Sequence, residues 1–99
     1  MSDAVSIQTA DFDLGAEVAK LRADDAGVGA VAAFLGTVRD RHAASPKAEV
    51  MLMELEHYPG MTERAIAKIV DEAKGRWQVM DCTVIHRYGA LQPNDQIVL

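Results

Sequence analysis

Four consecutive residues, Gly36-Thr37-Val38-Arg39, have the types and spacing of an anion-binding segment. Glycine has no Cβ atom, so the main chain at Gly36 can approach a ligand closely. Arg39 carries a planar fork of N–H donors that suits a phosphate or a carboxylate. The alternative is an ordinary arginine at a strand end, paired with Glu54 or Glu56.

The charge around this 36–39 segment favours a small anion over a polyanion. The formal net charge of the 99-residue chain is −5, which argues against general nucleic-acid binding. The basic side chains near the segment are Arg39, Arg41, His42 and Lys47, against Asp40 alone. A locally basic loop on an acidic protein attracts small anions. The other interpretation is a solvated loop with scattered charges.

Other reactive side chains have simpler interpretations. Glu54 and Glu56 lie two positions apart on a predicted strand and could do acid–base chemistry, although such pairs are usually charges on a solvated sheet face. Glu56 and His57 cannot bind one metal together, because adjacent strand residues point to opposite faces. We expect no metal site, with His86 as a packed sheet residue and Cys82 as a buried thiol.

The composition bounds the class of protein. One cysteine excludes an internal disulfide and a Cys-rich zinc site. The first residues lack the pattern of a secretory signal, and no apolar run is long enough to span a bilayer. We therefore predict one cytoplasmic domain over residues 1–99, with no nucleic-acid or membrane partner. No nucleotide or protease motif is present.

The spacing of apolar residues predicts an α+β fold with two helices and a largely antiparallel sheet. Asp13 has the position of the N-cap of the first helix. Pro59 is predicted in the first turn of the second helix, whose apolar stripe is Ile66, Ile69, Val70, Ala73 and Trp77. Strands are predicted at residues 5–8, 28–38, 49–57, 80–88 and 96–99, with a loop at 40–47 and a turn at 92–95. The 28–38 strand, almost continuously apolar, should be covered on both faces.

Three dense patches, at residues 34–41, 54–63 and 84–91, carry a family resemblance. Their sequences are FLGTVRDR, ELEHYPGMTE and VIHRYGAL. Taken in this order, they resemble the catalytic (large) subunit of molybdopterin synthase, from about residue 30 to Leu99. The resemblance implies an α/β-hammerhead fold and makes this chain similar to the N-terminal two-thirds of such a subunit.

The resemblance also implies an activity and partners. The family's enzymes are sulfurtransferases of molybdenum cofactor biosynthesis, which convert cyclic pyranopterin monophosphate into molybdopterin. The sulfur comes from a thiocarboxylate on the C-terminal Gly-Gly tail of a small ubiquitin-like carrier subunit. Two large subunits form a homodimer, and a carrier on each makes a heterotetramer. No cofactor is implied.

The family's pterin phosphate site includes a Gly-x-Val-Arg turn, which corresponds here to Thr37, Val38 and Arg39. Thr37 replaces a lysine often found there and keeps a hydroxyl donor. The catalytic residues are unknown, because the resemblance places the family's lysines beyond Leu99; the pair at residues 86–87 matches an earlier segment. The alternative function is a non-catalytic anion-binding or assembly module with the same fold.

Overall fold

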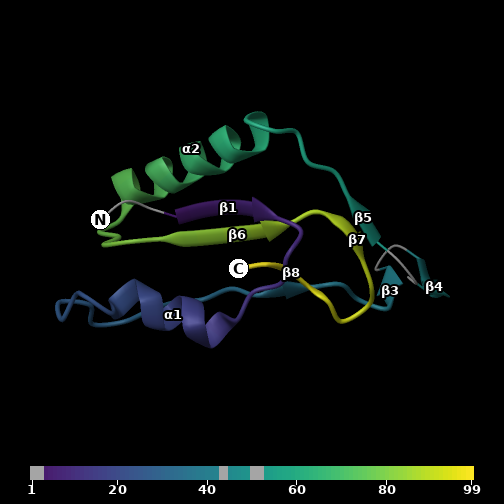
Figure 1. Cartoon of the computed structure of the whole chain (residues 1–99), viewed down its shortest axis with the longest axis horizontal. Helices are drawn as coiled ribbons and strands as arrows, with labels where there is room; N and C mark the ends of the chain where they lie inside the picture. Colours follow the sequence, from purple (N-terminus) through teal and green to yellow (C-terminus); the bar gives the residue numbers. More distant parts are fainter. Residues whose placement is uncertain (1–3, 43–44, 50–52) are drawn as a thin grey trace.

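The structure is a computed structural model that describes residues 4–42, 45–49 and 53–99. Its fold is α+β, as predicted, with both helices present (Figure 1). In chain order the elements are β1 (Ala4–Gln8), α1 (Leu14–Arg22), β2 (Gly36–Thr37), β3 (Arg41–His42), β4 (Ser45–Glu49), β5 (Met53–Leu55), α2 (Met61–Arg76), β6 (Thr83–Arg87), β7 (Gly89–Leu91) and β8 (Gln96–Val98).

The largest sheet has four strands in the order β1-β6-β8-β2. Strands β1 and β6 run parallel, and the other described pairings are antiparallel, which confirms the largely antiparallel prediction. Two smaller pairs, β3–β4 and β5–β7, lie together at one end of the molecule (Figure 1). The 36–39 segment begins on β2, at one edge of the four-stranded sheet.

Helix α1 begins where the sequence predicts. The Asp13 carboxylate accepts a 2.8 Å hydrogen bond from the Ala16 N–H, which satisfies a donor that the first turn leaves open. Glu17 in the first turn and Lys20 and Arg22 in the last turn complement the helix dipole. Capping and charge therefore help to stabilise this helix, whose apolar side chains Leu14, Val18 and Leu21 are half-buried.

Helix α2 begins at Met61, so the prediction that Pro59 lies in its first turn is wrong. Gly60 is the N-cap, with a φ of 80°. The Met61 N–H donates to the Tyr58 carbonyl at 3.1 Å, which closes a tight turn over residues 58–61. Proline at the second position and glycine at a positive φ in the third suit such a turn better than a helical start.

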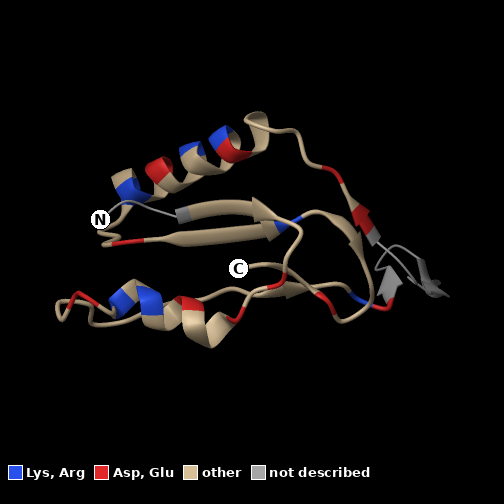
Figure 2. Cartoon of the chain, in the orientation of Figure 1, with Lys and Arg blue, Asp and Glu red and all other residues tan. Residues whose placement is uncertain are grey.

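The apolar stripe of α2 is only partly covered. Val70 is buried at 6% exposure, whereas Ile69 and Trp77 are 64% and 63% exposed. The helix packs along β1, so one line of the stripe has a partner in the described structure. Lys and Arg alternate with Asp and Glu over the rest of its surface (Figure 2).

The predicted strand over residues 28–38 is mostly wrong. Only Gly36 and Thr37 form a strand, and Phe34 upstream is 78% exposed. Of residues 28–38, strand β8 pairs with those two alone, so the preceding apolar run has no described ladder partner. An apolar run predicts burial, but a strand also needs a neighbour for its hydrogen bonds.

The loop predicted at residues 40–47 instead contains β3 and most of β4, which pair as an antiparallel hairpin. Among the described strands β4 pairs with β3 alone, and a proline such as Pro46 is compatible with an edge strand. The predicted 49–57 strand is divided between the end of β4 and β5, and its residues 50–52 lie outside the described residues. Around the end of β5, Glu54 and Glu56 are exposed and Leu55 is half-buried, as expected where side chains alternate between two faces.

The predicted 80–88 strand is shorter in the structure, and β7 follows it. Gly89, with a φ of 87°, lies at the bend between β6 and β7. The predicted turn at residues 92–95 and the strand after it are confirmed.

The buried apolar side chains of the described residues are Val38, Val70, Ile85 and Leu91. Neither helix of the described ranges has the length and apolarity that a membrane span requires.

Candidate anion-binding site

The 36–39 segment presents two polar side chains on either side of a buried one. Val38 is 3% exposed, whereas Thr37 and Arg39 are exposed. Alternate side chains of an extended chain point to opposite faces. Burial of Val38 therefore turns the Thr37 hydroxyl and the Arg39 guanidinium toward solvent, where an anion could reach both.

The main chain of Val38 is held at both of its polar groups. Its N–H donates to the Asp95 carbonyl at 2.9 Å, and its carbonyl accepts from the Asn94 N–H at 2.8 Å. Both partners belong to the 92–95 turn, far away in the sequence. The backbone that carries Arg39 is thus fixed by a turn rather than by a strand of its own.

Gly36 has a packing role in this structure. A Cβ atom on Gly36 would lie 2.9 Å from the Cγ1 atom of Val98 on β8, closer than Cβ atoms are found in proteins. The glycine therefore allows β2 and β8 to approach each other. This close approach brings the 36–39 segment against the strand that supports it.

The alternative of an arginine paired with a glutamate is not supported. Among residues 4–42, 45–49 and 53–99, no hydrogen bond or ion pair joins Arg39 to Glu54 or Glu56. Glu56 instead accepts a hydrogen bond from the Tyr58 hydroxyl. Charges of both signs lie on the connection from β2 to β3, where Asp40 follows Arg39 (Figure 2).

Strand β8 is itself held in place opposite Thr37. Gln96 is the register partner of Thr37, and its side-chain amide donates to Asp11 Oδ1 at 2.8 Å and to the Phe12 carbonyl at 2.6 Å. The carbonyl of Gln96 accepts a 3.0 Å hydrogen bond from Arg87 Nη1. These contacts connect the site to the segment between β1 and α1.

Arg87 is a structural side chain in this arrangement. It is 13% exposed, and its Nε donates to the Thr9 carbonyl at 3.0 Å. Hydrogen bonds from the Gln96 amide and the Phe12 N–H, with the nearby Arg87 charge, lower the pKa of Asp11 below its ordinary 3.8. Asp11 therefore stays ionised beside the guanidinium, and Arg87 is engaged within the protein.

A second polar cluster surrounds His57. Its Nε2 lies 2.5 Å from Glu63 Oε1, and the other oxygen of Glu63 accepts the Gly60 N–H at 2.7 Å. The imidazole also packs on Tyr88, with ring centroids 4.6 Å apart. Hydrogen bonds from His57 and from Gly60 lower the pKa of Glu63 below its ordinary 4.5. The cluster joins the end of β5 to the start of α2 and to the β6–β7 bend.

The paired carboxylates Glu54 and Glu56 lie on the surface near this cluster. With Leu55, His57 and Tyr58 they line an open hollow. The hydrogen bond from Tyr58 to Glu56 raises the pKa of the Tyr58 hydroxyl. Because two carboxylates line the hollow, it suits an anion poorly. The interpretation of these glutamates as charges on an exposed sheet face agrees with the structure.

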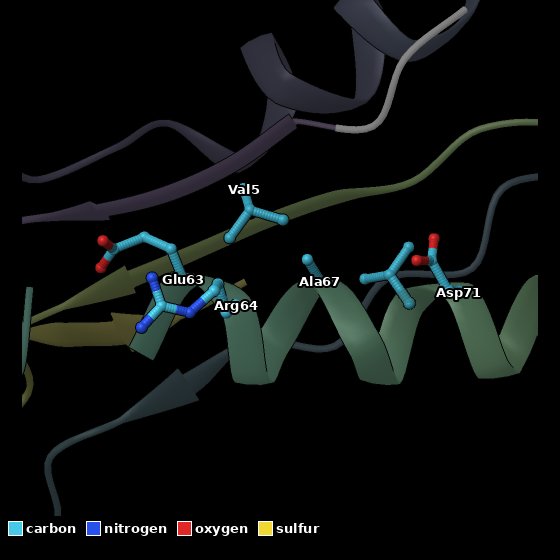
Figure 3. Close-up of a pocket in the computed structure, with 6 residues that line it drawn as sticks. Val5, Glu63, Arg64, Ala67 and Asp71 are labelled. Carbon is cyan, nitrogen blue, oxygen red and sulfur yellow. The ribbon is translucent and has the colours of Figure 1, made fainter. Parts of the chain in front are cut away.

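Another hollow lies between β1 and α2 (Figure 3). Val5 points toward the helix above Ala67, and Val70 completes the apolar part of the lining. Glu63, Arg64 and Asp71 contribute charges of both signs. This arrangement offers no nucleophile and no excess of positive charge, so we do not assign it a reaction.

The remaining predicted residues have mixed outcomes. His86 is half-buried on β6, with Nδ1 2.8 Å from the Arg87 carbonyl, which confirms it as a packed, hydrogen-bonded sheet residue. Cys82 is half-buried rather than buried, because it lies just before β6, outside the ladder. Within the described ranges, no three His, Cys, Asp or Glu side chains are grouped to hold a metal ion.

Two sets of contacts were not predicted from the sequence: those of the 92–95 turn with Val38, and those of Glu63 with Gly60 and His57. The Pro-Asn-Asp sequence predicts the 92–95 turn, but nothing in it indicates that Asn94 and Asp95 bond to Val38. The Glu63 contact has a local signal, since a glutamate three residues after an N-cap can bond back to it. The sequence places Thr37 and Arg39 correctly, but it does not reveal what holds them.

Comparison with known proteins identifies the family. The sequence model for the family described as "MoaE protein" matches residues 7–99. The chain therefore belongs to the MoaE protein family. Among similar proteins is the molybdopterin synthase catalytic subunit of Ralstonia nicotianae, 60% identical over 95 residues. The subunit of the same name from Pseudomonas aeruginosa is 46% identical over 95 residues.

Solved structures agree with this assignment. The molybdopterin biosynthesis MoaE protein from Burkholderia ambifaria MC40-6 is 54% identical with a TM-score of 0.84, and the match covers 97% of this chain and 60% of that one. The matches to the Ralstonia and Pseudomonas subunits each cover 96% of this chain, but 52% and 61% of those proteins. The chain thus spans about half to three-fifths of the length of these relatives.

Proposed function

We propose that the 36–39 segment binds the phosphate of cyclic pyranopterin monophosphate. The observation that carries the proposal is the buried, doubly hydrogen-bonded Val38, which leaves Thr37 and Arg39 exposed and unshielded by Glu54 or Glu56. Arg39 supplies charge and a fork of donors, and Thr37 supplies a hydroxyl. Both residue types can bond phosphate oxygens.

The activity that we infer is that of a molybdopterin synthase large subunit. Two thiocarboxylated carrier subunits would each deliver one sulfur atom to the pterin and be left as carboxylates, forming the dithiolene of molybdopterin. In this reaction Arg39 and Thr37 bind the phosphate, Arg39 also offsets its charge, and no catalytic residue is assigned. The names of the 60% and 46% identical relatives support this reaction class.

The partners and setting follow from the same proposal. We expect residues 1–99 to act as one domain, equivalent to the N-terminal part of a large subunit. Its partners would be the ubiquitin-like carrier with its Gly-Gly thiocarboxylate and a second large subunit, in a heterotetramer. The expected location is the cytoplasm, where the rest of molybdenum cofactor biosynthesis would supply the pterin.

Arg39→Ala tests the proposal by isothermal calorimetry with cyclic pyranopterin monophosphate. Hydrogen bonds to charged groups contribute roughly 1.5–3 kcal/mol, so the dissociation constant should rise by about one to two orders of magnitude. Lys68→Ala is the matched control, because it removes one exposed cation from α2, away from the 36–39 segment. Its affinity should match that of the native chain.

Equal affinities for Arg39→Ala and the native chain would refute the phosphate site. A second measurement distinguishes the alternative module. The native chain is mixed with thiocarboxylated carrier and pterin, and dithiolene formation is measured. Product would favour the synthase, whereas pterin binding without product agrees with either function, because the resemblance places the family's lysines beyond Leu99.

A further inference from the structure

The 92–95 turn has a conformation that only some residues adopt readily. The Asp95 N–H donates to the Gln92 carbonyl at 3.0 Å, and Pro93 occupies the second position. Asn94 in the third position has a φ of 75°, the one positive φ among the described non-glycine residues. Proline second and a positive φ third are the marks of a type II turn.

The turn type decides which way one N–H points. Types I and II differ mainly in the orientation of the peptide between the second and third residues. In this structure that peptide joins Pro93 to Asn94, and its N–H donates to the Val38 carbonyl at 2.8 Å. In a type I turn the same peptide would be reversed, so the Asn94 N–H would point away from Val38.

We propose that Asn94 is a positioning residue for the anion site, acting through the orientation of the Pro93–Asn94 peptide. The inference rests on the proposed function, since it concerns how Arg39 is placed for phosphate. Val38 directly precedes Arg39, and the Asn94 bond is one of its two main-chain anchors. Losing this anchor frees the backbone from which the guanidinium extends.

The side chain of residue 94 controls the equilibrium between the two turn types. Asparagine tolerates a positive φ, glycine adopts it without cost, and β-branched residues are strongly disfavoured there. The Asp95 carboxylate accepts the Gln92 N–H at 2.8 Å, and this bond does not involve the side chain of residue 94. Substitution at 94 thus changes the peptide orientation while this part of the turn is kept.

The test compares Asn94→Gly and Asn94→Val, each alone and with Arg39→Ala. Affinity for cyclic pyranopterin monophosphate is measured by calorimetry and folding by thermal melting. Asn94→Gly should bind like the native chain, and Asn94→Val about tenfold more weakly, because the anchor of Arg39 is lost. In the Arg39→Ala background, Asn94→Val should weaken binding no further.

The double variant separates positioning from general damage. If Asn94→Val binds as tightly as the native chain, or loses as much affinity without Arg39 as with it, the inference is overturned. If instead Arg39→Ala binds like the native chain, the proposed phosphate site itself fails. Should Asn94→Val not fold, Asn94→Ala makes the same test with a smaller conformational penalty.

Discussion

Two proline-containing turns of this chain have similar backbone conformations but bond to different parts of the molecule. The 58–61 and 92–95 turns each have proline second, a positive φ third (80° and 75°) and a closing hydrogen bond (3.1 and 3.0 Å). In each, a carboxylate accepts a main-chain N–H: Glu63 from Gly60 and Asp95 from Gln92.

The partners of the two turns lie at different distances along the chain. The 58–61 turn starts α2, and its contacts involve His57 and Glu63, which are close in sequence. The 92–95 turn bonds to Val38, across more than fifty residues. The first turn therefore builds a local element, and the second fixes a distant segment that carries the candidate site.

The largest expected effect is on the free energy of unfolding, when Gly60 of the 58–61 turn is replaced. Gly60→Val places a β-branched side chain at a φ of 80°, and its Cβ would lie 3.1 Å from Arg64 Nη1. Strain of this kind costs about 1–3 kcal/mol, which chemical denaturation would measure. Gly75→Ala is the control: its Cβ meets nothing within 4 Å, and it should stabilise α2 by about 0.5–1 kcal/mol. A neutral Gly60→Val would show that the turn tolerates ordinary residues.

A smaller effect is expected from the carboxylate of the second turn. Asp95→Ala removes the acceptor of the Gln92 N–H and should cost about 0.5–1.5 kcal/mol of unfolding free energy. Because the turn also holds Val38, pterin affinity should fall together with stability. Asp24→Ala, which removes an exposed carboxylate after α1, serves as the control. A loss of stability with unchanged affinity would separate the turn from the site.

The smallest effect concerns Glu63 and depends on pH. Its pKa is lowered in the folded state, first by the hydrogen bond from His57 and then by that from Gly60. The stabilisation is therefore present above its ordinary 4.5 and is lost as pH falls through the lower folded-state value. The melting temperature of Glu63→Gln should lie below that of the native chain at pH 7, and the gap should close in acid. A gap that persists at low pH would assign the effect to packing.

Local features of this fold could be predicted from the sequence because their causes are local. Asp13 caps α1 through a residue three positions away, and the Pro-Asn-Asp sequence is sufficient to predict the second turn. The candidate residues Thr37 and Arg39 were found from their types and from a family pattern. Their exposure agrees with that prediction, and their role as a phosphate site stays a prediction.

The parts that could not be predicted depend on distant partners. The apolar residues 28–35 have the composition of a buried strand, but the described pairing of β8 with this part of the chain includes Gly36 and Thr37 and none of residues 28–35. Trp77 fits a helical stripe, yet only part of α2 is covered by β1. Amino-acid composition indicates that a segment prefers burial. The residues with which a neighbouring strand pairs are instead determined by the whole fold.

The pairing of β1 with β6 has a consequence for the order in which the site forms. Residues 4–8 align with residues 83–87, and the segment after β1 meets Gln96, the register partner of Thr37. These contacts join residues that are far apart in the sequence, so forming them closes long loops. Loop closure is a slow and entropically costly step of folding. The candidate anion site thus depends on contacts between three distant parts of the sequence, and we expect it to be absent from a partly folded chain.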